Sequence, residues 1–330
     1  MREETAKRRF SLDILVKYGV YSIFLVMIVV FSISSKNFLT RSNIVLLLQQ
    51  AAPLCLGVVG MAFVMMDGGI DISAGSTMYL SAAIGSLFLK RLYDGGIDTS
   101  NIGWYIPVML VAVVVGALMG TFNGFLVSKA KILPFIVTLI TTNIGRGLGM
   151  YFTNGDIITT SSMGFKFAGK NFLGISVLIY FALAAVLIFH IVMRYTPYGC
   201  QLKAQGNNHE AAQKLGINIV RNTWVAYIIC GALCGLAGML TVGMTGSITI
   251  VFAEGNEFVI IPAAVLGGIS LFGGKGNIFP GAIIGILLTY TIVNVLTMVS
   301  ANPYVYTIVR GLIIFLAVMV DSLNYKGEIR

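Results

Sequence analysis

Long apolar runs alternate with short polar stretches along almost the whole chain. A helix needs about 20 apolar residues to cross a bilayer core. Because lipid offers no water to backbone groups, such runs are predicted to be helices rather than open strands. Ten runs fit this pattern: 18–33, 43–66, 74–89, 103–127, 133–152, 173–193, 223–246, 257–272, 278–298 and 304–321. The eighth is short and contains Pro262, Gly267 and Gly268, so we expect it to be broken or only partly spanning.

Composition agrees with this pattern. Hydrophobic residues make up 57% of the chain and charged residues 11%, whereas a soluble domain has roughly 25% charged residues. The sequence therefore predicts an all-α polytopic membrane protein with about ten transmembrane helices. Length alone would suggest two domains, but the alternation of runs favours a single helical bundle.

Lysine and arginine residues orient the chain, because they accumulate in cytoplasmic loops. With the N-terminus in the cytoplasm, fourteen fall on the cytoplasmic side and six outside, while Arg146 and Arg310 lie within apolar runs. These loops account for the net charge of +9 without a nucleic-acid partner. The expected organisation is a cytoplasmic segment 1–17, a transmembrane domain 18–321 that includes a cytoplasmic loop 194–222, and a cytoplasmic tail 322–330.

The stretch DGGIDISAGS, residues 67–76, forms a first glycine-rich junction between two apolar runs. Adjacent glycines Gly68 and Gly69 let the backbone bend. Asp71 and Ser73 can then cap a new helix that starts near Ala74, with Ser76 in its first turn. Acids within a membrane are candidate functional groups. Two interpretations remain open: a tight structural turn, and a gate or path element.

A second glycine-rich junction, LGGISLFGGKGNIFPG at residues 266–281, resembles the first in its GGI-x-x-S/F pattern. Gly267 and Gly268 correspond to Gly68 and Gly69, and Ser270 directly follows the GGI triplet. It is not a phosphate-binding Walker A loop, because Ile269 and Gly276 occupy two of the required positions.

Other small residues recur at three- and four-residue spacing, which favours close helix packing: Gly116, Gly120, Gly124, Gly231, Gly235, Gly238, Gly281 and Gly285.

Enzyme chemistry finds no support in the sequence. His190 and His209 belong to no HExxH pair, and there is no GxSxG elbow or cluster of carboxylates suited to acid–base work. The four cysteines follow no metal-binding or redox spacing, so we expect free thiols. The chain itself is predicted to bind no cofactor or metal and not to be an enzyme.

A polar helix is predicted at residues 207–216, within the loop 194–222. Asn207 or Asn208 would cap its start, and Gly216 would end it in a left-handed conformation. Glu210 falls in the first turn and Lys214 in the last, while Ala211, Ala212 and Leu215 form a small apolar face. Such a helix is too short to be stable alone in water. It must therefore rest on a partner or on its own bundle.

Four stretches together resemble the permease subunits of bacterial ATP-binding cassette (ABC) sugar importers, the family of the ribose and methyl-galactoside permeases. They are GGIDISAGS at 68–76, GNNHEAAQKLGIN at 206–218, VLGGISLFGGKGNIFPGAIIG at 265–285 and NPYVYTIVRGLIIFLAVMVDSLNY at 302–325. The resemblance implies a ten-helix permease in a bacterial inner membrane, paired with a second permease subunit. It also implies an extracytoplasmic sugar-binding protein and ATPase subunits that hold ATP and Mg. In that family the loop around Glu210-Ala211-Ala212 is the coupling helix, which enters a groove on the ATPase.

The chain departs from this resemblance at two positions. Asp67 stands where relatives usually carry Ser, Thr or Gln, and Gln205 replaces a common Gly. The resemblance leaves open which sugar or related solute is carried. A secondary transporter driven by an ion gradient, or a channel, is the alternative. A secondary transporter would need intramembrane ionisable residues, for which the candidates are Asp67, Asp71, Arg146, Arg310, Glu254 and Glu257.

Overall fold

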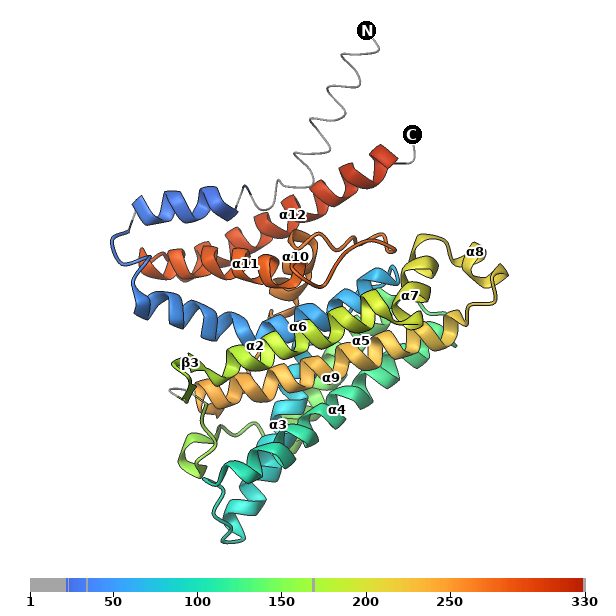
Figure 1. The fold of residues 1–330 in the computed structure, drawn as a ribbon. Helices are drawn as coiled ribbons and strands as arrows, with labels where there is room; N and C mark the ends of the chain where they lie inside the picture. Colours follow the sequence, from blue (N-terminus) through green and yellow to red (C-terminus); the bar gives the residue numbers. More distant parts are fainter. Residues whose placement is uncertain (1–21, 23, 34, 168–169, 329–330) are drawn as a thin grey trace.

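Residues 22, 24–33, 35–167 and 170–328 are described in a computed structural model, which is almost entirely helical (Figure 1). The first apolar run contributes a helix at Phe24–Ile33. The remaining α-helices are α2 (Arg41–Met66), α3 (Ala74–Asp94), α4 (Tyr105–Ser128), α5 (Pro134–Thr153), α6 (Val177–Tyr195), α7 (Pro197–Asn207), α8 (His209–Lys214), α9 (Ile219–Thr245), α10 (Glu257–Leu266), α11 (Gly281–Met298) and α12 (Pro303–Glu328). A helix thus stands at each of the ten predicted places, which confirms the all-α class.

Not every predicted span is long and apolar enough to cross a membrane by itself. Within the described residues five helical stretches meet that condition: Arg41–Met66, Ile102–Ser128, Val177–Tyr195, Ile219–Thr245 and Gly281–Met298. The Ile102–Ser128 stretch combines the 3-10 turn η1 (Ile102–Trp104) with α4. The short α10 confirms that the eighth run is only partly spanning, because it ends before Gly267 and Gly268.

Several helix boundaries differ from the sequence-based prediction, and one helix was not predicted. The start of the sixth run forms a hairpin instead, in which β2 (Asn171–Phe172) pairs with β3 (Ile175–Ser176), so α6 begins only at Val177. The helix α12 continues through the predicted tail to Glu328. The helix α7 was not predicted, because its composition, PYGCQLKAQGN, is polar and contains glycine. The predicted segment 1–17 lies outside the described residues.

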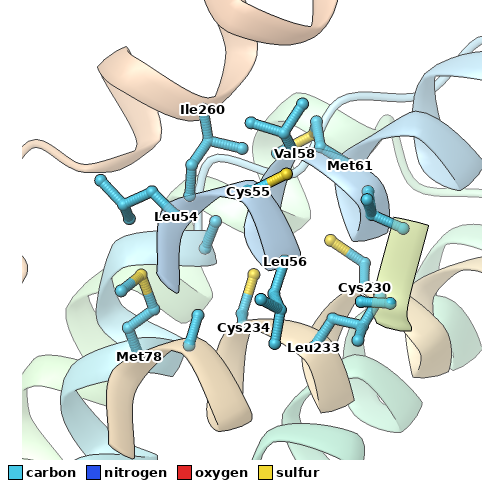
Figure 2. Close-up of a cluster of buried hydrophobic side chains, with 14 of the residues drawn as sticks. Leu54, Cys55, Leu56, Val58, Met61, Met78, Cys230, Leu233, Cys234 and Ile260 are labelled. Carbon is cyan, nitrogen blue, oxygen red and sulfur yellow. The ribbon is translucent and has the colours of Figure 1, made fainter. Parts of the chain in front are cut away.

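The core is built around the second part of α2, in which every residue from Ala51 to Met66 is buried. Figure 2 shows its Cys55, Val58 and Met61 among side chains of α9 and α10. Cys55, Cys230 and Cys234 are buried free thiols. A helix surrounded by apolar side chains on all sides needs no amphipathic pattern, which explains why α2 and α9 read as uniformly apolar runs.

Glycines let α4 and α9 pack backbone to backbone, as their spacing predicted. A Cβ atom added at Gly116 would overlap the Gly231 carbonyl oxygen, and one added at Gly120 would overlap the Tyr227 carbonyl oxygen. The same holds between α10 and α11, where an added Cβ at Gly285 would overlap the Ala263 carbonyl oxygen. Small residues thus replace side-chain packing at these crossings.

Loops gather at two opposite ends of the bundle. At one end, β1 (Ile158–Thr159) pairs antiparallel with β4 (Ser247–Ile248), and Tyr105 donates its hydroxyl hydrogen to the Gly164 carbonyl oxygen at 2.5 Å. At the other end lie both glycine-rich junctions, the α4–α5 loop and the α7–α8 segment, which projects from the bundle in Figure 1. If successive predicted runs cross the membrane in alternating directions, these four segments must lie on the same side, as they do here.

Candidate functional site

The first glycine-rich junction begins with a sharp stop of α2. Gly68 has φ +87°, the left-handed conformation that glycine adopts without steric cost. Its N–H donates to the Met65 carbonyl oxygen at 2.9 Å, and the Gly69 N–H donates to the Val64 carbonyl oxygen at 2.9 Å. This is a Schellman motif, which satisfies two carbonyl groups at the end of the helix.

Asp71 then forms the turn that leads into α3. Its Oδ1 atom accepts from the Ser73 N–H at 2.9 Å and from the Ser73 hydroxyl at 2.5 Å. Asn123 of α4 donates to the Ser73 Oγ at 2.8 Å, and Ser76 donates to the Ser73 carbonyl oxygen at 2.8 Å. The predicted start at Ala74 is confirmed, but Ser73 makes no side-chain cap and Asp71 bonds to Ser73 rather than to α3 amides. Capping is replaced here by a turn.

The second junction ends its helix with the same Schellman motif, but the motif is placed one residue later relative to the glycine pair. Gly268 has φ +83°. Its N–H donates to the Val265 carbonyl oxygen at 2.8 Å, and the Ile269 N–H donates to the Ala264 carbonyl oxygen at 3.1 Å. The left-handed residue is therefore the first glycine of the pair at 68–69 but the second at 267–268. The sequence likeness between the two junctions is real, but their geometry aligns with an offset of one residue.

A carboxylate also supports the second junction, but it comes from another helix. Asp321 of α12 accepts from the Leu271 N–H at 2.8 Å and from the Ser270 hydroxyl at 3.2 Å through the same oxygen. Ser270 Oγ accepts in turn from the Phe272 N–H at 3.2 Å. Sequence reasoning missed Asp321, because it lies far along the chain near the end of an apolar run.

The predicted polar helix is observed as α8, shorter than expected. Asn208 is the N-cap, and its side chain accepts from the Ala211 N–H at 2.9 Å. Gly216 has φ +79°, as a left-handed stop requires. Asn207 instead ends α7, and Leu215 is the C-cap residue.

The apolar face of α8 differs from the one predicted. Leu215 is 79% exposed and Ala211 is exposed, as a surface that meets a partner would be. Ala212 is only 2% exposed and faces the chain's own body. The prediction that Ala212 belongs to the presented face was wrong, because a six-residue helix lying on its bundle points one alanine inward. Glu210 and Lys214 are exposed, as predicted.

Positive charge collects beside this helix. Lys203 on α7 is half-buried near Arg194, the basic residue in the last turn of α6. Burial, and then the positive charge of Arg194, lowers the pKa of Lys203. Both basic residues, Arg194 and Lys203, lie at the end of the bundle that carries α8. This is the distribution expected of a cytoplasmic end.

The corner between α7 and α8 contacts both glycine-rich junctions at once. The Gly274 N–H of the second junction donates to the Met66 carbonyl oxygen at the end of α2, at 2.8 Å. Gly206 packs over this bond, and an added Cβ there would overlap the Met66 carbonyl oxygen and lie 2.5 Å from the Gly274 nitrogen. Figure 1 shows the α10–α11 loop extending toward α7. Three motifs far apart in sequence thus form one site.

Side chains add a second connection at the same place. Gln205 Nε2 donates to the Asp67 carboxylate, and Gln205 Oε1 accepts from Asn222 Nδ2 at 3.1 Å. His209 Nε2 lies 3.3 Å from the Asp67 carbonyl oxygen. Asp67 and Gln205, the two departures from the family resemblance, therefore contact each other. Gln205 was not among the predicted site residues, and the paired departures were the only sequence signal that pointed to it.

A cavity of ≈ 700 Å³ lies between the first junction and α8. Its lining includes Asp67, Gly69, Lys131, His209, Thr223 and Tyr227. The Tyr227 hydroxyl donates to the Ile70 carbonyl oxygen at 3.4 Å. The first junction is therefore flanked on one side by packed helices and on the other by an open space with polar and apolar lining residues.

The remaining intramembrane charges lie on other elements. Arg146 of α5 donates to the Phe252 carbonyl oxygen at 3.2 Å and stacks over the Tyr79 ring at 5.4 Å. Arg310 of α12 donates to the Gly255 carbonyl oxygen at 3.4 Å. Glu257 is buried, and its Oε2 has no hydrogen-bond partner among the described residues. The described residues bring no three His, Cys, Asp or Glu side chains together as a metal site.

Comparison with known proteins identifies the family. Residues 43–318 match a family described as the permease component of branched-chain amino acid transport systems. The chain belongs to this permease family. It is an integral membrane protein and a transport-system permease rather than an enzyme. No solved structure matches it.

Individual relatives of the permease are similar over nearly its whole length. A ribose import permease protein of Bacillus subtilis is 33% identical over 96% of this chain and 97% of its own. A galactose/methyl galactoside import permease protein of Haemophilus influenzae is 32% identical over 96% of this chain and 97% of its own. A D-allose transport system permease protein of Escherichia coli is 32% identical over 94% of this chain and 93% of its own.

Proposed function

We propose that this chain is the membrane-spanning permease subunit of an ABC importer in a bacterial inner membrane, carrying a monosaccharide or a similar small polar solute. The names of its relatives, which cover ribose, galactose and allose, support this class of solute. The chain would work as a dimer, with identical or different permease subunits. An extracytoplasmic binding protein would deliver the solute, and a cytoplasmic ATPase would hold ATP and Mg.

The observation that carries the proposal is the meeting of the α7–α8 corner with both junctions. An ATPase that moves α8 would also move Gly206, which packs on Met66 and Gly274. In this proposal the residues that meet the ATPase are Asn207, Asn208, Glu210, Ala211, Lys214, Leu215 and Gly216, with Ala212 supporting them from within. The gate residues are Gly68, Gly69, Asp71, Ser73, Ser76, Gly267, Gly268 and Ser270.

A bulky substitution on the exposed face of α8 tests the coupling role. Ala211→Trp should leave the chain inserted and dimeric but weaken co-purification with the ATPase, or abolish solute-stimulated ATP hydrolysis in lipid. Ala130→Trp, an exposed alanine in the α4–α5 loop at the same end, is the matched control. Full attachment and stimulation in Ala211→Trp would show that α8 is not the coupling element.

Orientation is tested by labelling. In a Cys200→Ser background, which removes the exposed native thiol, Ser100→Cys and Ser162→Cys should react with an impermeant reagent from outside. Ala130→Cys and Glu210→Cys should not. All four positions are exposed, so a lack of labelling reports the side of the membrane rather than burial. The opposite pattern would remove the support for coupling.

The ion-coupled alternative rests on Glu257, the buried acid with an unpartnered oxygen among the described residues. By contrast, Asp67 and Asp71 accept hydrogen bonds from within the chain. Vesicles that contain this chain alone separate the two functions. Uptake driven by an ion gradient without an ATPase would support the secondary transporter, and uptake that requires the ATPase and ATP would support the importer.

A further inference from the structure

We propose that Asp67 and Gln205 form a polar link that transmits movement of the coupling segment to the first glycine-rich junction. The link deepens the proposed function and rests on it. Asp67 is a positioning residue in this view: it ties the end of α2 to α7 and takes no part in binding the solute or ATP. The link would account for the carboxylate that this chain carries beside its glycines.

Because Asp67 and Gln205 are buried, each needs a hydrogen-bond partner of the right kind. Asp67 is 6% exposed and Gln205 is 0% exposed, so an unpaired polar atom at either position would be costly. A carboxylate can only accept hydrogen bonds, whereas a glutamine amide both donates and accepts. Gln205 therefore turns its Nε2 toward Asp67, with Thr223 Oγ1 at 3.3 Å, and its Oε1 toward Asn222.

The pair joins elements that the proposed mechanism moves. Gln205 lies in the last turn of α7, directly before the Gly206 contact and the Asn208 cap of α8. Asp67 directly precedes Gly68, which sets the direction of the chain toward Asp71. A displacement of α8 thus reaches the junction through the Gln205–Asp67 bond, the His209 contact with the Asp67 carbonyl oxygen and the Gly206 backbone contact. Of these, only the Gln205–Asp67 bond joins two side chains, so exchanging its two residues tests it without altering glycine conformation.

Exchanging the acid and the amide provides the test. Gln205→Glu places two carboxylates against each other, so solute-stimulated ATP hydrolysis by the assembled importer should fall about tenfold. Asp67→Asn keeps an acceptor and should stay within about threefold of wild type. The double variant, Asp67→Asn with Gln205→Glu, restores a donor–acceptor pair with the charge on the other side and should recover most of the stimulation. Basal hydrolysis should be unchanged in all three.

A matched control distinguishes transmission from general stability. Asn43 and Asn294 form a reciprocal amide pair between α2 and α11, at 3.0 and 2.8 Å, far along α2 from the junction. Asn294→Ala removes a comparable interhelical connection, and it should lower thermal stability while leaving the stimulation ratio unchanged. An equal loss of stimulation in this control would overturn the link, because any weakened helix contact would then suffice.

Failure of the link is distinguishable from failure of the proposed function. If the wild-type chain neither binds an ATPase nor supports ATP-dependent uptake, the proposed function fails. If wild type is stimulated but Gln205→Glu is stimulated equally, or the double variant does not recover, the link fails alone. Should Gln205→Glu not insert, Asp67→Ala and Asp67→Asn carry the same test, because an alanine side chain has no acceptor for Gln205. Stimulation should then fall in the alanine variant only, and equal values would overturn the link.

Discussion

The two glycine-rich junctions share a helix stop but differ in what supports the chain after it. At the first, the supporting carboxylate, Asp71, belongs to the junction itself and is 1% exposed. At the second, the carboxylate is Asp321 of α12, which is only half-buried. The stop therefore depends on local sequence, whereas the support depends on which neighbours the fold brings close.

This difference predicts different mechanical roles. Side chains from α4, α7 and α9 bond to the first junction through Asn123, Gln205 and Tyr227, so hydrogen bonds from three helices hold it. The second junction exposes Phe272, Lys275 and Phe279. Segments with fewer buried contacts open at lower free energy. We infer that the first junction transmits movement as a unit while the second yields, and the following substitutions test that inference.

The largest effect is expected at Gly206, where both junctions and α7 meet. Gly206→Ala would push a methyl group into the Met66 carbonyl oxygen and toward the Gly274 nitrogen. Neither is a flexible side chain, so the backbones must separate at a cost of about 1–3 kcal/mol. Uptake should fall to background at normal expression. Gly311→Ala, on an exposed part of α12 with nothing within 4 Å of the added Cβ, is the control. Normal uptake in Gly206→Ala would remove the three-way contact from the mechanism.

A large but graded effect is expected at Asp71. Asp71→Asn keeps an oxygen that can accept from the Ser73 N–H, so part of the uptake should remain. Asp71→Leu leaves buried donors unpaired, at about 1–3 kcal/mol, and should lose most of the uptake. Equal loss in both variants would point instead to an obligatory negative charge, as in ion coupling.

The loop between α3 and η1 contains a matched control for Asp71. Asp98 accepts from the Ser100 N–H at 3.0 Å and from the Ser100 hydroxyl at 2.5 Å, the same two bonds that Asp71 makes with Ser73. These bonds hold the pKa of Asp98 below its usual range. Asp98 is exposed, so Asp98→Leu should leave uptake unchanged. A loss there as large as in Asp71→Leu would mean that the turn itself, rather than its buried position, matters.

A smaller effect is expected at Asp321, whose carboxylate is half-buried. Asp321→Ala removes the acceptor for the Leu271 N–H and the Ser270 hydroxyl, which water can partly replace. We expect a loss of unfolding free energy near 1 kcal/mol and uptake within about threefold of wild type, with Asp321→Asn milder still. If Asp321→Ala abolished uptake as Asp71→Leu does, the second junction would be as tightly held as the first.

The pattern of the sequence predicted what depends on local chemistry. Apolar length predicted the helices, and the order Asn208, Glu210, Gly216 predicted the cap and stop of α8. The sequence pattern could not predict the direction of side chains in a short helix or the contacts between distant segments. Ala212 faces inward because of how α8 lies on the bundle, and Asp321 reaches Ser270 only after α12 has packed. Gly206 meets Met66 across more than a hundred residues of chain, a separation that no local pattern reports.

The last effect is expected in stability rather than in uptake, and it tests the offset between the two helix stops. Alanine in a left-handed conformation costs roughly 1–2 kcal/mol, while asparagine tolerates it. Gly68→Ala and Gly268→Ala should therefore be less stable to thermal unfolding in detergent than Gly68→Asn and Gly268→Asn. Both sites have room for a side chain, since an added Cβ meets nothing closer than 3.8 Å at Gly68 and nothing within 4 Å at Gly268.

At Gly267 the φ is −72° and an added Cβ would overlap the Gly281 carbonyl oxygen, so the larger asparagine should be no better than alanine. Alignment of the two GGI triplets would instead pair Gly68 with Gly267. An advantage of asparagine at 267 rather than 268 would show that the sequence register, and not the observed Schellman geometry, describes the second junction.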